Sequence, residues 1–232
     1  QVNRIGCAVI GQTKSLAPAD KVLYALRDVT GTVDSMPLIV SSILSKKIAA
    51  GCDAVVLDVK TGTGAIMPTL QGSIELATKM VSIGNMTGRR FSALVTAMDQ
   101  PLGLNVGNAL EVEEAIDVLS GRVTGDLLDV SVKLGTHMLL STKRVSSVEQ
   151  GTDRLMEALR SGAGLKKFAE MIEAQGGNPE VVHHPELLPQ APESIILRAE
   201  AGGYVRRMHT ERIGNAARAL GAGRERKEDA ID

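Results

Sequence analysis

Two apolar runs of strand length constrain the fold more than any other feature of this sequence. Ala54–Val59 and Phe91–Thr96 are nearly continuous in apolar residues, which is typical of strands buried on both faces of a sheet. The segment between them, at 74–85, has the length and the apolar content of a helix. A strand, a helix and a second strand in this order predict an α/β domain with a largely parallel mixed sheet.

Shorter signals place the remaining elements. Cys7–Ile10, which ends at Gly11, predicts a strand, and Ser35 with Pro37 marks the start of a helix over 38–50. Asn108 and Glu111 fit a capping box at the start of another helix, whose expected buried stripe is Val112, Ala115, Ile116 and Leu119. Further helices are expected at Lys21–Arg27, Leu127–Leu139, Val148–Arg160 and Leu165–Ala174.

The composition of the sequence changes near residue 178. Four prolines between 179 and 192 indicate a linker over 179–193, and beyond it Ser194–Ala199 and Tyr204–Met208 predict strands. We therefore expect residues 1–18 and 50–178 to form the α/β domain, 19–49 to form part of a small all-α domain, and 194–232 to begin a C-terminal α+β domain.

Composition argues against several classes of partner. The 26 basic and 27 acidic residues nearly cancel, and aromatic residues are only 2%, so neither nucleic acid nor an anionic membrane is expected as a partner. No apolar run approaches the roughly 20 residues that span a bilayer. Cys7 and Cys52 lack the spacing of metal ligands. A disulfide between them is the alternative, but a reducing, cytoplasmic location is favoured.

The densest group of polar residues on apolar scaffolding lies between 24 and 47. Ser42 and Lys46 are four apart and share one face of the predicted helix, and the preceding loop can fold Arg27 back beside that face. A guanidinium, a hydroxyl and an ammonium suit a planar ligand edge that carries carbonyls and an N–H. The alternative is a solvated basic helix end, because Lys46 and Lys47 are favourable near a helix C-terminus.

Several motifs resemble one known family. The stretch from Asp20 through Lys47 carries Ala-Leu-Arg-Asp-Val-Thr and Ser-x-x-Ser-Lys-Lys, and 54–62 reads Ala-Val-Val-Leu-Asp-Val-Lys-Thr-Gly. Asp-Gln-Pro-Leu-Gly at 99–103, Val-Gly-Asn-Ala-Leu-Glu-Val at 106–112 and Gly-Ala-Gly-Arg at 221–224 continue the likeness. The chain thus resembles the pyrimidine-nucleoside and thymidine phosphorylases over nearly its whole length.

The resemblance implies phosphorolysis of uridine, thymidine and deoxyuridine to the free base and (deoxy)ribose 1-phosphate. It places Arg27, Ser42 and Lys46 around the base, with Arg27 and Lys46 stabilising the departing base anion. The pyrimidine nucleoside and inorganic phosphate are the implied partners, with a homodimer as the assembly and no organic cofactor.

Asp20 is a further candidate catalytic residue, since it belongs to the same matching stretch. Its alternative role is the N-cap of the helix that opens at Lys21. The family's phosphate-binding residues lie upstream of the matched stretch, so none is assigned in this chain. Lys60-Thr61-Gly62-Thr63-Gly64 lacks the Walker spacing and predicts only a strand-to-helix turn.

Some members of the family hold a potassium-like monovalent cation. The matching positions here are the backbone carbonyls of Leu102 and Asn105 and the side chain of Glu114, which are hard oxygen donors suited to such an ion. The alternative for Glu114 is a solvated acid on a helix surface.

Other functions remain open at this stage. Gln1 opens the chain without an initiator Met, so we expect a fragment that lacks the phosphate-loop part and the extreme C-terminus, and that is inactive alone. A base-binding module without activity is one alternative, and a phosphoribosyltransferase of similar architecture is another. The second would need a divalent-metal site beside a Gly-rich loop, and no acidic pair at that place in the sequence suggests one.

Overall fold

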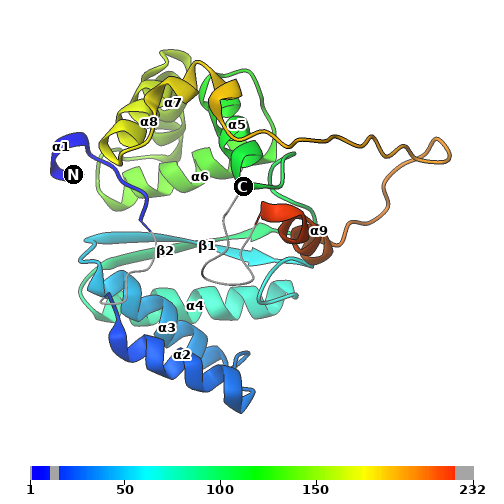
Figure 1. Cartoon of the computed structure of the whole chain (residues 1–232). Coiled ribbons are helices and arrows are strands. Elements are labelled where there is room, and N and C mark those ends of the chain that lie inside the picture. The colour runs from blue at the N-terminus through cyan, green and yellow to red at the C-terminus, as the bar shows by residue number, and fades with distance from the viewer. Residues whose placement is uncertain (1, 11–15, 223–232) are drawn as a thin grey trace. The chain divides into compact units, whose positions relative to one another are not determined.

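A computed structural model describes residues 2–10 and 16–222 of the chain. Figure 1 shows the helices and strands of these residues, which divide into two compact units by their contacts. One unit comprises the described residues within 9–97 and 130–155, and the other comprises those within 1–8, 98–129 and 156–232. Gly223 and Arg224, which complete the last motif of the sequence analysis, lie outside the described residues.

The sheet of the first unit contains two strands that pair in parallel. Strand β1 (Ala54–Thr61) and strand β2 (Arg90–Ala97) run in register from Ala54 opposite Arg90 to Thr61 opposite Ala97. Helix α4 (Leu70–Met86) connects them and packs on both strands. The predicted α/β class and the parallel pairing are therefore confirmed.

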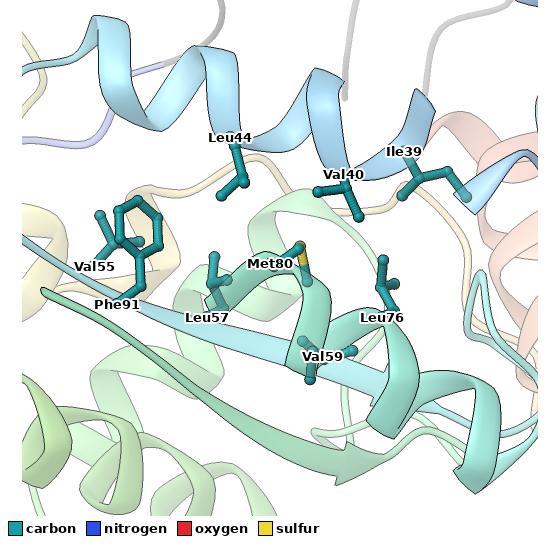
Figure 2. Packing of buried hydrophobic residues seen from close by; sticks show 10 residues of the cluster. Ile39, Val40, Leu44, Val55, Leu57, Val59, Leu76, Met80 and Phe91 are labelled. Carbon is teal, nitrogen blue, oxygen red and sulfur yellow. The ribbon is translucent and has the colours of Figure 1, made fainter. Parts of the chain in front are cut away.

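One face of this sheet carries the apolar core. Alternate residues of β1, Val55, Leu57 and Val59, are buried because side chains along a strand point to opposite faces (Figure 2). Helix α3 (Met36–Ala49) lies over the same core and contributes its own buried residues, as Figure 2 shows for Ile39, Val40 and Leu44. The core thus fixes the position of α3 relative to β1 and α4.

Helix α2 (Pro18–Thr30) is attached to α3 by a different kind of contact. It ends at Gly31, whose left-handed φ of 66° suits the absence of a Cβ, and the loop that follows leads into α3 at Ser35. Among the side chains of α2 whose burial is described, Arg27 is the buried one, whereas Val22, Leu26 and Val29 are exposed. Polar contacts, rather than a buried apolar stripe, therefore hold α2 against α3.

The remaining helices are α1 (Val2–Ile5), α5 (Asn108–Leu119), α6 (Asp126–Ser141), α7 (Val148–Arg160), α8 (Ala163–Ala174) and α9 (Thr210–Ala217). Short 3₁₀ turns follow α8 at Pro179–Val182 and Pro185–Leu187, and a π-helical turn follows α9 at Arg218–Ala222. In the second unit, α8 packs against α1, α5 and the first of these turns. The helices predicted at residues 127–139, 148–160 and 165–174 are confirmed.

Three predicted strands are wrong. Residues 7–10, 194–199 and 204–208 have no regular secondary structure. A strand needs a neighbour for its backbone hydrogen bonds, and the sheet within the described ranges pairs only β1 with β2. Apolar content alone cannot supply that neighbour, and Ile195, Leu197 and Tyr204 are largely exposed.

The capping box at Asn108 is also wrong in detail. The N-cap of α5 is Gly107, which has no side chain to accept a hydrogen bond, and Asn108 is already the first helical residue. Glu111 keeps half of the expected motif, because its Oε1 accepts from the Gly107 amide at 3.1 Å. Ile116 of the predicted stripe is fully buried, and Glu114 and Val118 are buried beside it.

The assignment of 19–49 to a separate small domain, and the other domain boundaries, stay predictions. None of the helices in the described part of the chain combines the length and the hydropathy needed to cross a membrane.

Candidate functional site

The side chains of Asp20, Ser42 and Lys46 meet between α2 and α3. The Lys46 ammonium lies 2.7 Å from Oδ2 of Asp20 and also donates to the Ser42 hydroxyl at 2.7 Å. Ser42 is buried, and the side chains of Lys46 and Asp20 are only 19% and 14% exposed. This part of the predicted base pocket is therefore assembled as a compact network of hydrogen bonds.

Local helix geometry explains why these three residues meet. Ser42 and Lys46 are one turn apart on α3, while Val40 and Leu44 of the same helix enter the core. Asp20 lies in the first turn of α2, where the helix dipole favours a negative charge. The N-cap of α2 is Ala17, so the alternative role of Asp20 as N-cap is wrong.

The network also sets the charge state of Asp20. Burial acts to raise the pKa of this carboxyl, and it is the largest single influence. The hydrogen bond from Lys46, the nearby Ser42 hydroxyl and the positive charges of Lys46 and Arg27 together outweigh burial and hold the pKa below its ordinary value. Asp20 is consequently an anion at neutral pH.

Arg27 lies on the same helix but is bonded differently. It is only 5% exposed, and its two terminal nitrogens donate to the backbone carbonyls of Val33 and Leu38, the second at 3.4 Å. Its Nε is buried without an acceptor among the described residues, and its guanidinium lies 5.1 Å from the centre of the Tyr24 ring. In this state Arg27 therefore braces the loop between α2 and α3.

The two lysines at the end of α3 differ sharply. Lys47 is exposed to solvent, as a basic helix end would be, whereas Lys46 is mostly buried and paired. Adjacent helical residues point about 100° apart, which accounts for the difference. The alternative of a solvated basic helix end thus describes Lys47 but not Lys46.

The predicted cation ligands lie in the other unit. Glu114 on α5 is 6% exposed, which contradicts the alternative of a solvated acid. Its Oε1 accepts from the Leu104 amide at 2.7 Å, and its Oε2 accepts from the Asn105 amide at 3.0 Å. A Cβ at Gly103 would lie 2.3 Å from Oε2, so only glycine lets the carboxylate approach this closely.

Leu102, Asn105 and Glu114 line one cavity of about 350 Å³, which α9 also borders through Thr210 and Ile213. The carboxylate has about four lone-pair positions, of which the two amides use one on each oxygen. The chemistry of the donor set therefore fits a hard monovalent cation, although the amides of Leu104 and Asn105 were not foreseen from the sequence. Main-chain donors carry no sequence signal beyond the neighbouring Gly103.

A polar cluster on the sheet was also missed. Lys60 on β1 donates to Asp58 at 2.7 Å and to Thr96 of β2 at 2.9 Å, and Thr96 donates to Asp58 at 2.5 Å. Asp58 and Lys60 are two residues apart on β1, so their side chains share a face of the strand, and this spacing can be read from the sequence. The register of Thr96 opposite Lys60 could not be read from it.

Comparison with known proteins matches residues 1–165 to the family described as "Glycosyl transferase family, a/b domain". The chain belongs to this family. Every candidate residue from Asp20 to Glu114 falls inside the matched range. Residues 204–232 match a second family, "Pyrimidine nucleoside phosphorylase C-terminal domain". The predicted linker at 179–193 lies between the two matches.

The chain is also similar over its whole length to named proteins. It is 52% identical over 231 residues to proteins named pyrimidine-nucleoside phosphorylase from Staphylococcus aureus (strain USA300) and from Staphylococcus haemolyticus (strain JCSC1435). The alignment covers 100% of this chain and 53% of each relative, so the chain spans about half their length. The family resemblance seen in the sequence is thereby confirmed.

Proposed function

We propose that the protein to which this chain belongs catalyses phosphorolysis of pyrimidine nucleosides, and that the chain supplies the base pocket. The substrates are uridine, thymidine and deoxyuridine with inorganic phosphate, and the products are the free base and (deoxy)ribose 1-phosphate. The observation that carries the proposal is the buried, paired Lys46 beside Ser42, at the positions that the family resemblance indicates. The names of the relatives support the reaction class.

The chemistry explains why cations are needed at this place. Phosphate oxygen forms a bond to the anomeric carbon of the pentose, and the bond from that carbon to N1 breaks. The electron pair stays on the base, so its ring carbonyls gain negative charge. A fixed ammonium stabilises this charge more in the transition state than in the substrate, which lowers the barrier.

Lys46 is suited to that task because of its donor count. An ammonium has three N–H donors, and Asp20 and Ser42 accept two of them. Among its contacts in the described residues, one donor is left for a carbonyl of the base. Ser42 holds the ammonium from the same helix and, at this position, orients the ring.

Arg27 requires a rearrangement to act on the base. Its terminal nitrogens are held by the carbonyls of Val33 and Leu38, so contact with a ligand means exchanging at least one of these bonds. The unpartnered Nε indicates that the resting arrangement does not satisfy the guanidinium fully. We propose that base binding draws Arg27 towards the ring and changes the conformation of the loop between α2 and α3.

The proposal is tested by measuring base release from uridine, thymidine and deoxyuridine, with and without phosphate. In a protein that carries this chain at the full length of its relatives, release should depend strictly on phosphate. The chain alone should bind uracil, seen as chemical-shift changes at Ser42 and Lys46, and should release no base. Base release by the full-length protein in the absence of phosphate would refute phosphorolysis.

We further propose that Glu114, with the carbonyls of Leu102 and Asn105, holds a monovalent cation such as potassium. The shared cavity and the spare lone pairs of the carboxylate support this assignment. Potassium chloride should raise the melting temperature of the chain more than N-methylglucamine chloride at equal ionic strength. Glu114→Gln should remove that difference, and an equal response to both salts would contradict the assignment.

The homodimer, the cytoplasmic location and the absence of nucleic-acid and membrane partners stay predictions. Light scattering of the full-length protein would establish its assembly state.

A further inference from the structure

We propose that Asp20 is a positioning residue, which acts on the reaction only by holding the Lys46 ammonium in place for the departing base. The inference rests on the proposed function of Lys46. Asp20 reaches Lys46 from a different helix, at 2.7 Å, and the two residues are 26 positions apart in the sequence. The contact is therefore a product of the fold and not of helix periodicity.

The network fixes Lys46 from two sides. Ser42 accepts from the ammonium on α3 and lies close enough to Asp20 to help lower the pKa of that carboxyl. The ammonium thus donates to one acceptor on its own helix and to one on α2. A free lysine samples many rotamers, whereas these two hydrogen bonds restrict the ammonium to one place before the ligand arrives. Losing the carboxylate would leave Ser42 as its one acceptor among the described residues.

Direct contact between Asp20 and the base is the less favourable arrangement. The base gains negative charge as the bond to N1 breaks, and a carboxylate against the ring would oppose that charge. In its observed position the carboxylate faces Lys46, with Arg27 close enough to influence its pKa. Asp20 is thereby separated in role from the groups that meet the base.

A purely architectural role is the other alternative. Asp20 joins α2 to α3, and the described side chains of α2 bury little else besides Arg27, so attaching the helix would be the whole role of the ion pair. The two roles differ in what a neutral replacement does. An attachment role changes the fraction of folded protein, whereas a positioning role changes turnover per folded molecule.

The test is a double-mutant cycle in the full-length protein, with Asp20→Asn, Lys46→Met and the double variant. Initial rates with thymidine at saturating phosphate give kcat and KM, and circular dichroism gives the folded fraction. Glu75→Gln is the matched control, because it removes an ion pair of 2.6 Å to Lys79 on α4, in the same unit and away from the network.

We expect Asp20→Asn to lower kcat about tenfold with little change in KM, within the range of directly coupled residues. In the Lys46→Met background the same change should have no further effect, and Asp20→Glu should recover part of the activity. Glu75→Gln should match the unmodified protein.

Two results would overturn the inference. If the effects of Asp20→Asn and Lys46→Met multiply, Asp20 acts on the reaction independently of Lys46. If Asp20→Asn lowers activity only in proportion to the folded fraction, its role is architectural. An inert Lys46→Met would instead remove the base-pocket proposal itself, which the cycle distinguishes from failure of the positioning role alone.

Discussion

Lys46 and Glu114 are both largely withdrawn from solvent, yet their charges are satisfied in opposite ways. Lys46 is held by two side chains, one of which, Asp20, comes from another helix. Glu114 is held by two backbone amides nine and ten residues away in its own unit. Burying either charge without partners would be costly, so both arrangements are required by the same physical constraint.

The two arrangements differ in how easily a hydrogen-bond partner of the charged group can be exchanged. Side chains change rotamer on binding, so the network around Lys46 can admit a ligand acceptor without disturbing the backbone. Amides of the loop at 104–105 cannot turn away from Glu114 unless the loop itself changes shape. We infer that the first site is built for chemistry, and that the second is built to shape a loop and its cavity.

The largest expected effect tests the first half of this comparison. Lys46→Met should lower kcat/KM for phosphorolysis by about 10²-fold or more, since losing one aimed donor costs ~3 kcal/mol in comparable oxyanion sites. Lys47→Met is the control, because Lys47 is exposed and its side chain points away from the network. Initial rates give kcat/KM for both variants, and an equal loss of kcat/KM in the two would contradict the special role of Lys46.

These two sites also show how far the sequence could be read. Helical spacing placed Ser42 and Lys46 on one face, and the apolar runs placed β1 and β2, because both signals are local. The partnership of Asp20 with Lys46, and of Glu114 with the amides of the loop, joins residues whose closeness depends on packing. Family resemblance pointed to those residues, but their contacts came only from the structure.

Arg27 shows a second limit on what can be predicted from the sequence. Residue type and family resemblance predicted a position near a ligand, yet the guanidinium is bonded to the carbonyls of Val33 in the loop and of Leu38 in the first turn of α3. Exposed runs such as 194–199 show the same limit for strands, because pairing requires a partner that composition does not specify. Residue type indicates which bonds a group can make, and packing decides which bonds it makes.

The second half of the comparison predicts a loss of stability. Glu114→Gln should lower the free energy of unfolding by about 1–3 kcal/mol, because an amide NH₂ would face one backbone N–H and leave that donor without an acceptor. Urea denaturation of the chain measures this quantity. The neighbouring Glu113→Gln is the control, and a similar loss in both variants would show that the buried carboxylate has no special role in the loop.

Gly103 offers a second test of how the Glu114 carboxylate supports the loop. Gly103→Ala should destabilise the chain by about 1–3 kcal/mol, because the new Cβ would lie 2.3 Å from Oε2 of Glu114 and force the loop away from the carboxylate. Gly202→Ala is the control, since no atom lies within 4 Å of a Cβ at that position. The melting temperatures of the two variants should therefore differ, with only Gly103→Ala lowered.

The smallest expected effect concerns pH and returns to Asp20. Its folded-state pKa is lowered relative to the unfolded chain, so the carboxylate contributes stability that is fully present above the unfolded value, near pH 4. That contribution is lost as the pH falls through the lower, folded value. Asp20→Asn should thus destabilise the chain at pH 7 and have a smaller effect at pH 3. Because the pair is partly exposed and screened by salt, the difference should be under about 1 kcal/mol.

Urea denaturation at both pH values measures this difference, with Glu75→Gln as the control for an exposed pair. An Asp20→Asn effect that was the same at pH 7 and pH 3 would show that the charge of Asp20 does not stabilise the fold, and that its hydrogen bonds alone connect α2 to α3.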